Sequence, residues 1–279
     1  MLARRGGQKF QISIDGERIS AAALDHALSG ADTYVALDLG SVGTRRVRVE
    51  TSQSGGLVRI YTASSSRVYL PVYDQEFCMV SLGDSVASGT GAPSASAWQT
   101  AFMKRMGLTD SRMVALGGSG FLNPGTNESK FGDAARLMDV YEAKPDLIMF
   151  NVTINDTTLH ANDPALFKAT VIQTMQEYRS QHPDVPIFLG SMWPGEYPGG
   201  TTLTRRQAME ADAFDAFEEW ADPNSWAFEN FGMGLIDAAW LAGGNNGFNS
   251  DASHPNAAGH LYIAEWWIAQ IQSRFSISL

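Results

Sequence analysis

Residues 80–89 read Val-Ser-Leu-Gly-Asp-Ser-Val-Ala-Ser-Gly, and this stretch is the most informative one in the chain. Together with Cys78 and Met79 it contains an apolar run with the length of a buried parallel strand. The run leads straight into a Gly-Asp-Ser turn, a pattern typical of a strand that passes into a helix. It predicts that the hydroxyl and the backbone N–H of Ser85 lie at the carboxyl end of a strand, at a helix N-terminus.

Strand and helix patterns alternate after this turn. Further apolar runs of strand length are residues 112–116, 147–152 and 187–190. Apolar residues recur at helical spacing in residues 164–182 and 203–220 and in a last segment after residue 256. This alternation predicts an α/β domain in which a parallel sheet has helices on both faces. Ligands in such domains bind beyond the carboxyl ends of the strands.

The first part of the chain has a different pattern. Apolar and polar residues alternate there with a period of two, in runs at residues 10–14, 34–39, 46–50 and 57–61. Short alternating runs separated by Gly, Ser and Asp are typical of half-buried antiparallel strands. We therefore expect a small β-sandwich-like domain over residues 1–74, followed by the α/β domain over residues 75–279.

Composition narrows the classes of function. The 279 residues carry a formal net charge of −10, which disfavours binding to nucleic acid or to an anionic membrane. No apolar run reaches the ~20 residues of a membrane-spanning helix. Cys78 is the only cysteine, which excludes an intramolecular disulfide and argues against a cysteine metal site. The charged first residues lack the apolar core of an export signal, so the sequence indicates no compartment.

A second stretch supplies groups that could activate Ser85. Residues 251–256 read Asp-Ala-Ser-His-Pro-Asn and precede the last predicted helix. A serine hydroxyl needs an adjacent base to attack an ester, and a carboxylate can hold Nδ1–H of a histidine so that Nε2 acts as that base. Asp251 and His254 are close enough in sequence for this arrangement. The alternatives are structural: Ser85 could cap a helix, and Asp251 or Ser253 could cap the last helix.

Two more polar turns follow predicted strands. Asn155 and Asp156 come after residues 147–152, where a side-chain amide could donate to an oxyanion. Residues 117–120, Gly-Gly-Ser-Gly, come after residues 112–116 and could let backbone N–H groups approach a substrate. The alternatives are an Asx turn or a helix cap for the Asn-Asp pair and a plain turn for the glycines.

In this order the stretches resemble the four sequence blocks of the SGNH hydrolase superfamily, the GDSL-type esterases and lipases. The resemblance covers residues 77–279 and rests on Gly83-Asp84-Ser85 with Gly89, Gly117-Gly118, Asn155-Asp156 and Asp251-x-x-His254-Pro255-Asn256. It implies a flavodoxin-like three-layer α/β/α fold.

The resemblance also implies roles for individual residues. Ser85 would be the nucleophile, His254 the base, and Asp251 the residue that orients His254. The oxyanion hole would consist of the N–H of Ser85, the N–H of Gly118 and the side chain of Asn155.

The match leaves two points open. Gly117 could serve in place of Gly118. Thr153 stands where the third block usually has glycine, which puts the loop shape and the acyl pocket in question.

The implied reaction is acyl transfer to water through an acyl-enzyme, without a metal or an organic cofactor. The first part of the chain resembles the jelly-roll-like domain that precedes the hydrolase domain in some carbohydrate esterases. Trp193, Trp226 and Trp240 could stack on sugar rings, or they could pack in the core or at its rim. We expect hydrolysis of short acyl esters, such as O-acetyl groups, on a saccharide; such a substrate would suit an extracellular or periplasmic setting.

Three other functions are compatible with parts of this pattern. A non-catalytic glycan-binding protein could keep the same fold, and a lipase or acyltransferase could share the superfamily. An α/β-hydrolase is disfavoured, because Ser85 follows the first strand of its domain and the Asp251–His254 spacing is short.

Overall fold

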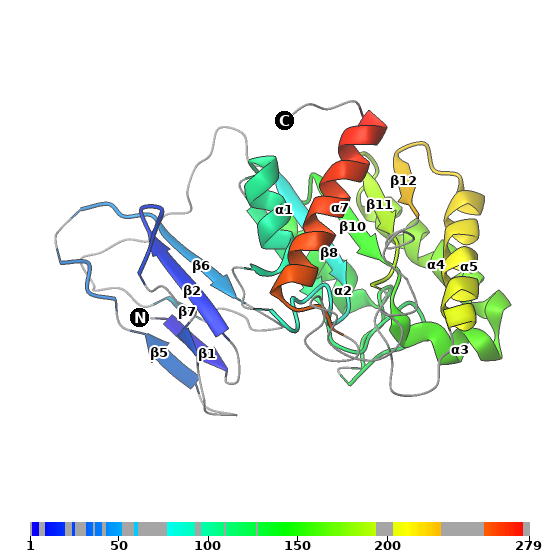
Figure 1. Ribbon diagram of the computed structural model, residues 1–279, viewed down its shortest axis with the longest axis horizontal. Coiled ribbons are helices and arrows are strands. Elements are labelled where there is room, and N and C mark those ends of the chain that lie inside the picture. Colours follow the sequence, from blue (N-terminus) through cyan, green and yellow to red (C-terminus); the bar gives the residue numbers. More distant parts are fainter. Residues whose placement is uncertain are drawn as a thin grey trace. The chain divides into compact units, whose positions relative to one another are not determined.

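The computed structural model describes residues 2–5, 9–19, 24–25, 32–35, 37–40, 43–51, 59–60, 77–92, 96–108, 110–126, 128–193, 203–229 and 254–275. The chain divides into two compact units (Figure 1). The first comprises residues 1–75 and 93–95, and the second comprises residues 76–92 and 96–279.

The described part of the first unit contains two antiparallel sheets. In one sheet, β1 (Leu2–Arg5) pairs with β5 (Asp32–Val35) and β7 (Arg59–Ile60). In the other, β2 (Lys9–Ile14) pairs with β3 (Glu17–Arg18), β4 (Leu24–Asp25) and β6 (Val47–Thr51). Ile12 is fully buried and packs against Ile14, Leu37 and Val49, as the alternating pattern predicts for a half-buried strand.

The predicted strand over residues 34–39 ends earlier than expected. β5 stops at Val35, and residues 37–39 have no regular structure. The Asp38 carboxylate accepts the N–H of Gly40 at 2.9 Å, which is an Asx turn. This local hydrogen bond competes with strand pairing and explains the shorter strand.

The second unit is built on one five-stranded sheet with the order β12-β11-β10-β8-β9. The strands are β8 (Cys78–Gly83), β9 (Asp110–Ala115), β10 (Leu147–Asn151), β11 (Ile187–Gly190) and β12 (Ser225–Phe228). All their pairings are parallel. In chain order the strands therefore lie 5-4-3-1-2, which is the flavodoxin-like order. The predicted fold class is confirmed.

Helices cover both faces of this sheet (Figure 1). Successive side chains of β8 point to opposite faces, so the strand contributes to a core on each side. Val80 and Leu82 point into one core with α2 (Ala134–Ala143), α4 (Pro164–Gln181) and α5 (Leu203–Trp220). Met79 points into a second core with α1 (Trp98–Met106) and α7 (Ala257–Phe275). Because both faces are buried, the strand reads as a continuous apolar run. No helix among the described residues is both long enough and apolar enough to span a bilayer.

The passage from β8 into a helix is less direct than predicted. Residues 84–92 form a series of turns, here called the Ser85 turn, and α1 begins only at Trp98. The N–H of Thr90 donates to the carbonyl of Ser85 at 2.9 Å, but Gly89 has φ 80° and turns the chain away from a helical path. The expectation that Ser85 begins a helix is therefore wrong.

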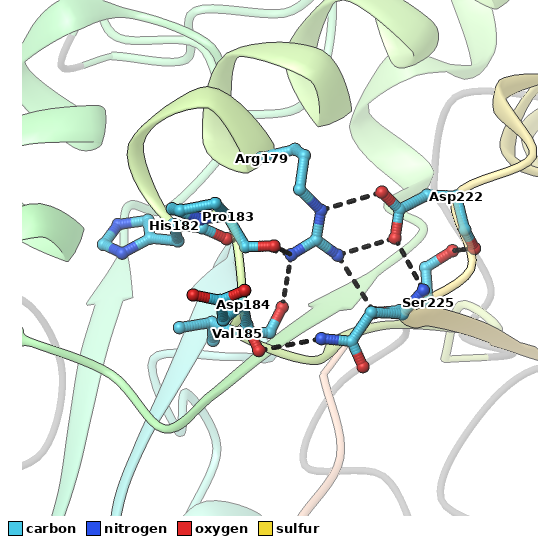
Figure 2. Close-up of polar contacts among 8 residues, drawn as sticks. Arg179, His182, Pro183, Asp184, Val185, Asp222 and Ser225 are labelled. Atoms are coloured by element: carbon cyan, nitrogen blue, oxygen red, sulfur yellow. Dashed lines mark hydrogen bonds and ion pairs between the residues drawn. The ribbon is translucent and has the colours of Figure 1, made fainter.

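A largely buried arginine, Arg179, makes polar contacts with the residues that precede β11 and β12, as Figure 2 shows. Arg179 forms a bidentate pair with Asp222 at 2.8 and 2.7 Å. The rest of its guanidinium donates to the carbonyls of His182, Pro183, Val185 and Asn224. These carbonyls lie in the loops that lead into β11 and β12, so one side chain sets the start of both strands.

We predict that Arg179→Met lowers the free energy of unfolding of the second unit by about 2–4 kcal/mol, because it leaves the largely buried Asp222 and the loop carbonyls without their donor. The two side chains are only 15% and 12% exposed. All seven tryptophans lie in the second unit, so urea unfolding followed by tryptophan fluorescence reports on that unit.

Arg105→Met is the matched control. Arg105 pairs with Glu265 at 3.0 Å, and the two side chains are 53% and 49% exposed. Its loss should cost about 1 kcal/mol or less. Equal losses in the two variants would contradict the role given to Arg179.

Candidate active site

Ser85 and His254 meet at the carboxyl edge of the sheet. Ser85 follows β8 directly, and His254 comes just before α7. Nε2 of His254 lies 2.9 Å from Oγ of Ser85, although the two residues are 169 positions apart. Asn256 caps α7, since its Oδ1 accepts the N–H groups of Ala258 and Gly259. The predicted partner Asp251 and its neighbour Ser253 lie outside the described residues.

The carboxylate of Asp84 ties the Ser85 turn to the end of β10. Asp84 is buried, and its Oδ1 accepts the N–H of Val86 at 2.8 Å. Its Oδ2 accepts hydrogen bonds from the Thr153 hydroxyl at 2.5 Å and from Nδ2 of Asn155 at 3.2 Å. A buried carboxylate needs such donors. The predicted site residue Asn155 is thereby held beside the Ser85 turn.

The carboxylate of Asp156 holds the segment that follows the glycine-rich residues 117–120, here called the glycine loop. This carboxylate is fully buried and accepts the N–H groups of Phe121, Leu122 and Asn123 at 2.7, 3.0 and 2.8 Å. Burial raises the pKa of Asp156 to about 6 although these three donors lower it. A Cβ at Gly120 would lie 2.4 Å from the Asp156 oxygens, so only glycine fits there. The two neighbouring residues therefore have different partners: Asn155 contacts Asp84, and Asp156 binds the backbone after the glycine loop.

Three backbone N–H groups in the Ser85 turn and in the glycine loop have no hydrogen-bond acceptor among the described residues. They are those of Ser85, Gly117 and Gly118. A Cβ placed on Gly117 would lie 3.8 Å from Cβ of Ser85, so this loop runs beside the serine. Unpaired N–H groups at such a place can bind an anionic oxygen.

Arg136 is a buried residue near the site to which no sequence pattern pointed. Its Nη2 donates to the carbonyls of Gly83 and Val114, both at 2.8 Å, and Nη1 donates to the Ser119 hydroxyl at 3.2 Å. Burial lowers the pKa of Arg136 below its usual value. The guanidinium joins the ends of β8 and β9, from which the Ser85 turn and the glycine loop start.

His260 ties α7 to the Ser85 turn. Nδ1 accepts the N–H of Trp98 at 3.4 Å, so Nε2 carries the proton that it donates to the carbonyl of Thr90 at 3.0 Å. Burial, together with the nearby His254, lowers the pKa of His260 to about 4. His260 is therefore a neutral structural link and leaves His254 as the histidine that faces Ser85.

A pocket that is partly open to solvent lies beside Asp84 at the same edge of the sheet. Its walls include Val86, Trp193 and Trp266. Trp193 is only 6% exposed and belongs to the second core, which supports core packing for this residue. Trp226 packs edge-on against Phe188 and Phe275, which supports core packing for this residue instead of sugar stacking. Trp240 lies outside the described residues.

The sheet order and the blocks gathered at its carboxyl edge define an SGNH hydrolase fold. The chain matches the GDSL-like lipase/acylhydrolase family over residues 81–261 and belongs to that family. It is a carboxylic ester hydrolase. A GDSL lipase of Mycobacterium tuberculosis (strain ATCC 25618 / H37Rv) is 26% identical to it over 194 residues, which are 66% of this chain and 77% of that protein.

Solved structures of similar fold include two carbohydrate esterases. A family two carbohydrate esterase from Clostridium thermocellum, in complex with cellohexaose, matches with a TM-score of 0.66 and 16% identity and covers 99% of this chain and 89% of its own. A family two carbohydrate esterase with a carbohydrate binding domain, from Corynascus thermopiles (Myceliophthora fergusii), matches with a TM-score of 0.65 and 18% identity over 99% and 91% of the two chains.

His260 and Asp156 make opposite contributions to stability in acid. The pKa of His260 falls from 6.5 to about 4 on folding, so below pH 6.5 the unfolded chain binds a proton that the folded chain does not. Stability from His260 is thus present above pH 6.5 and is lost as the pH falls toward 4. The pKa of Asp156 rises from 3.8 to about 6, so the folded chain binds the extra proton and gains stability as the pH falls from 6 toward 3.8.

We predict that His260→Asn reduces the loss of unfolding free energy between pH 7 and pH 4.5 by about 2–3 kcal/mol, and that Asp156→Asn increases that loss by a similar amount. Urea unfolding by tryptophan fluorescence at fixed ionic strength measures both slopes. An unchanged slope in His260→Asn would show that this histidine is protonated in the folded protein as readily as in the unfolded chain.

Proposed function

We propose that Ser85 is the nucleophile and His254 the general base of a serine esterase, with Asp251 orienting His254. The hydrogen bond of 2.9 Å between Nε2 of His254 and Oγ of Ser85 carries this proposal. A hydroxyl and an imidazole at this distance can exchange the proton that nucleophilic attack requires. Ser85 also stands at the carboxyl edge of a parallel sheet, where ligands bind in such folds.

In the first step Oγ of Ser85 attacks the ester carbonyl carbon and its proton passes to Nε2 of His254. The tetrahedral oxyanion accepts hydrogen bonds from the N–H groups of Ser85 and Gly118 and from Nδ2 of Asn155. Gly117, whose N–H is equally unpaired, is the alternative to Gly118. Collapse of the intermediate expels the alcohol, which takes the proton from His254. Water then repeats the sequence on the acyl-enzyme.

We propose a short acyl group, such as acetyl, on a saccharide alcohol as the substrate. The pocket beside Asp84 has tryptophan side chains in its walls, and such side chains can pack against the apolar part of a small ester. The similarity in fold to carbohydrate esterases supports a saccharide as the alcohol part.

We predict that Ser85→Ala lowers kcat for p-nitrophenyl acetate and for an acetylated xylo-oligosaccharide by about 10⁴-fold or more, because it removes the atom that forms the acyl-enzyme. The assay is release of nitrophenol and of acetate. Ser180→Ala is the control, since this serine is exposed at the end of α4 and binds only the carbonyl of Glu177. Rates equal to wild type in Ser85→Ala would exclude the serine mechanism.

The wild-type enzyme also tests two further parts of the proposal: the length of the acyl group and whether water accepts it. A higher kcat/KM for octanoate than for acetate esters would contradict the short-acyl substrate and leave Ser85 in place. Transfer of acetyl to an added sugar in preference to water, seen by mass spectrometry of the products, would identify an acyltransferase. Saccharide binding without any acyl release would identify a glycan-binding protein.

A further inference from the structure

The turn after β10 carries a buried hydroxyl between two residues of the site. Thr153 is 2% exposed and caps the short 3-10 helix η2 (Ile154–Asp156). Its Oγ lies 2.5 Å from Oδ2 of Asp84, 3.2 Å from the backbone N of Asn155 and 2.9 Å from Nδ2 of Asn155. One oxygen therefore contacts the Ser85 turn, the main chain of Asn155 and its side chain.

The direction of these hydrogen bonds follows from counting protons. A threonine hydroxyl has one proton and two lone pairs, and a carboxylate can only accept. The proton of Thr153 therefore goes to Asp84, and the lone pairs face the two N–H groups of Asn155. Asp84 in this way makes Thr153 an acceptor toward Asn155.

This arrangement determines which way the Asn155 amide points. Nδ2 of Asn155 faces three acceptors: Thr153 Oγ, Asp84 Oδ2 and the carbonyl of Ser119 at 3.1 Å. A flipped amide would place its carbonyl oxygen against these oxygens and leave buried acceptors unpaired, which is costly. The Asn155 amide has only two N–H bonds for these three acceptors. When a charged oxyanion forms, it can replace a neutral acceptor such as the carbonyl of Ser119, because a hydrogen bond to a charged group is stronger.

We propose that Thr153 is a positioning residue that fixes the orientation of the Asn155 amide, so that its Nδ2 and not its carbonyl oxygen lies on the side of Asp84 and the Ser85 turn. The inference rests on the proposed function, in which Asn155 donates to the oxyanion. Thr153 touches no reacting atom and acts through Asn155. Its hydroxyl, and not its size, is the feature that matters.

The chain offers a close control for this idea. Thr157, the first residue of α3 (Thr157–Asn162), is 1% exposed and donates only to the carbonyl of Ile154, at 2.6 Å. Thr157→Val removes the same hydroxyl at the same burial, four residues further along, without touching Asp84 or Asn155. Thr153→Ser keeps the hydroxyl and removes only a methyl group.

The experiment measures kcat and KM for p-nitrophenyl acetate in Thr153→Val, Thr153→Ser, Thr157→Val and Asn155→Ala and in the Asn155→Ala/Thr153→Val double variant. We expect Thr153→Val to lower kcat about 10- to 100-fold with KM nearly unchanged, as misplacement of an oriented group does. Thr153→Ser and Thr157→Val should keep kcat near that of the wild type, and melting followed by tryptophan fluorescence should show that Thr153→Val is still folded at the assay temperature. Asn155→Ala should lose about 10²–10³-fold, and adding Thr153→Val to it should cost no more than about twofold, because the two residues act as one unit.

Other results would contradict either the positioning role of Thr153 or the proposed serine mechanism, and the two cases can be told apart. If Ser85→Ala and Asn155→Ala are impaired but Thr153→Val equals Thr157→Val in kcat, the positioning role is wrong and the proposed function stands. If Thr153→Val costs as much in the Asn155→Ala background as in wild type, Thr153 does not act through Asn155. If Ser85→Ala is fully active, the serine mechanism itself fails.

Discussion

The buried carboxylate of Asp84 is the contact on which the arrangement of the site depends. It stands between β8 and Ser85, and burying it is favourable only if donors reach both of its oxygens. Val86 supplies one donor from the Ser85 turn, and Thr153 and Asn155 supply two from the end of β10. Satisfying a single charged group thus joins the loops that follow two neighbouring strands of the sheet.

Other buried polar groups repeat this principle around the carboxyl edge. Asp156 binds the backbone just after the glycine-rich residues 117–120, Arg136 joins the ends of β8 and β9, and His260 links α7 to Thr90. Loops at a sheet edge bury little apolar surface of their own, so these hydrogen bonds set their positions. The result is a serine, a histidine and unpaired N–H groups that come from distant parts of the sequence and meet in one place.

The main features of the fold follow from the sequence because they depend on local pattern. The apolar runs of β8, β10 and β11 and the periodicity of α4 and α5 predict those elements closely. Several elements were not predicted, among them α1, α2 and β12 in the second unit. Helix α1 carries polar residues such as Gln99 and Lys104 among its apolar ones, α2 is short, and β12 is a run of four residues without a β-branched side chain. Each depends on tertiary packing more than on its own pattern.

The residues of the candidate site that stand in a sequence motif could be predicted, and the buried residues that support them could not. Ser85, His254 and Asn155 stand in recognisable blocks, and the structure brings all three to one edge. Arg136 and His260 bear no motif, because a buried polar residue within a helix is recognised only by the carbonyl groups it meets in the folded chain. Thr153 was visible only as a departure from the family pattern, and its hydrogen bonds give that departure a physical meaning.

In the proposed mechanism, Oγ of Ser85 forms the covalent bond to the acyl group. The most direct test of this step is to treat the enzyme with an aryl phosphonofluoridate, in which a serine oxygen displaces fluoride at phosphorus, and to locate the adduct by peptide mass spectrometry. We predict one adduct on the peptide that contains Ser85, formed far more slowly in His254→Ala. An adduct on another serine, or equal labelling of the His254→Ala protein, would contradict the account.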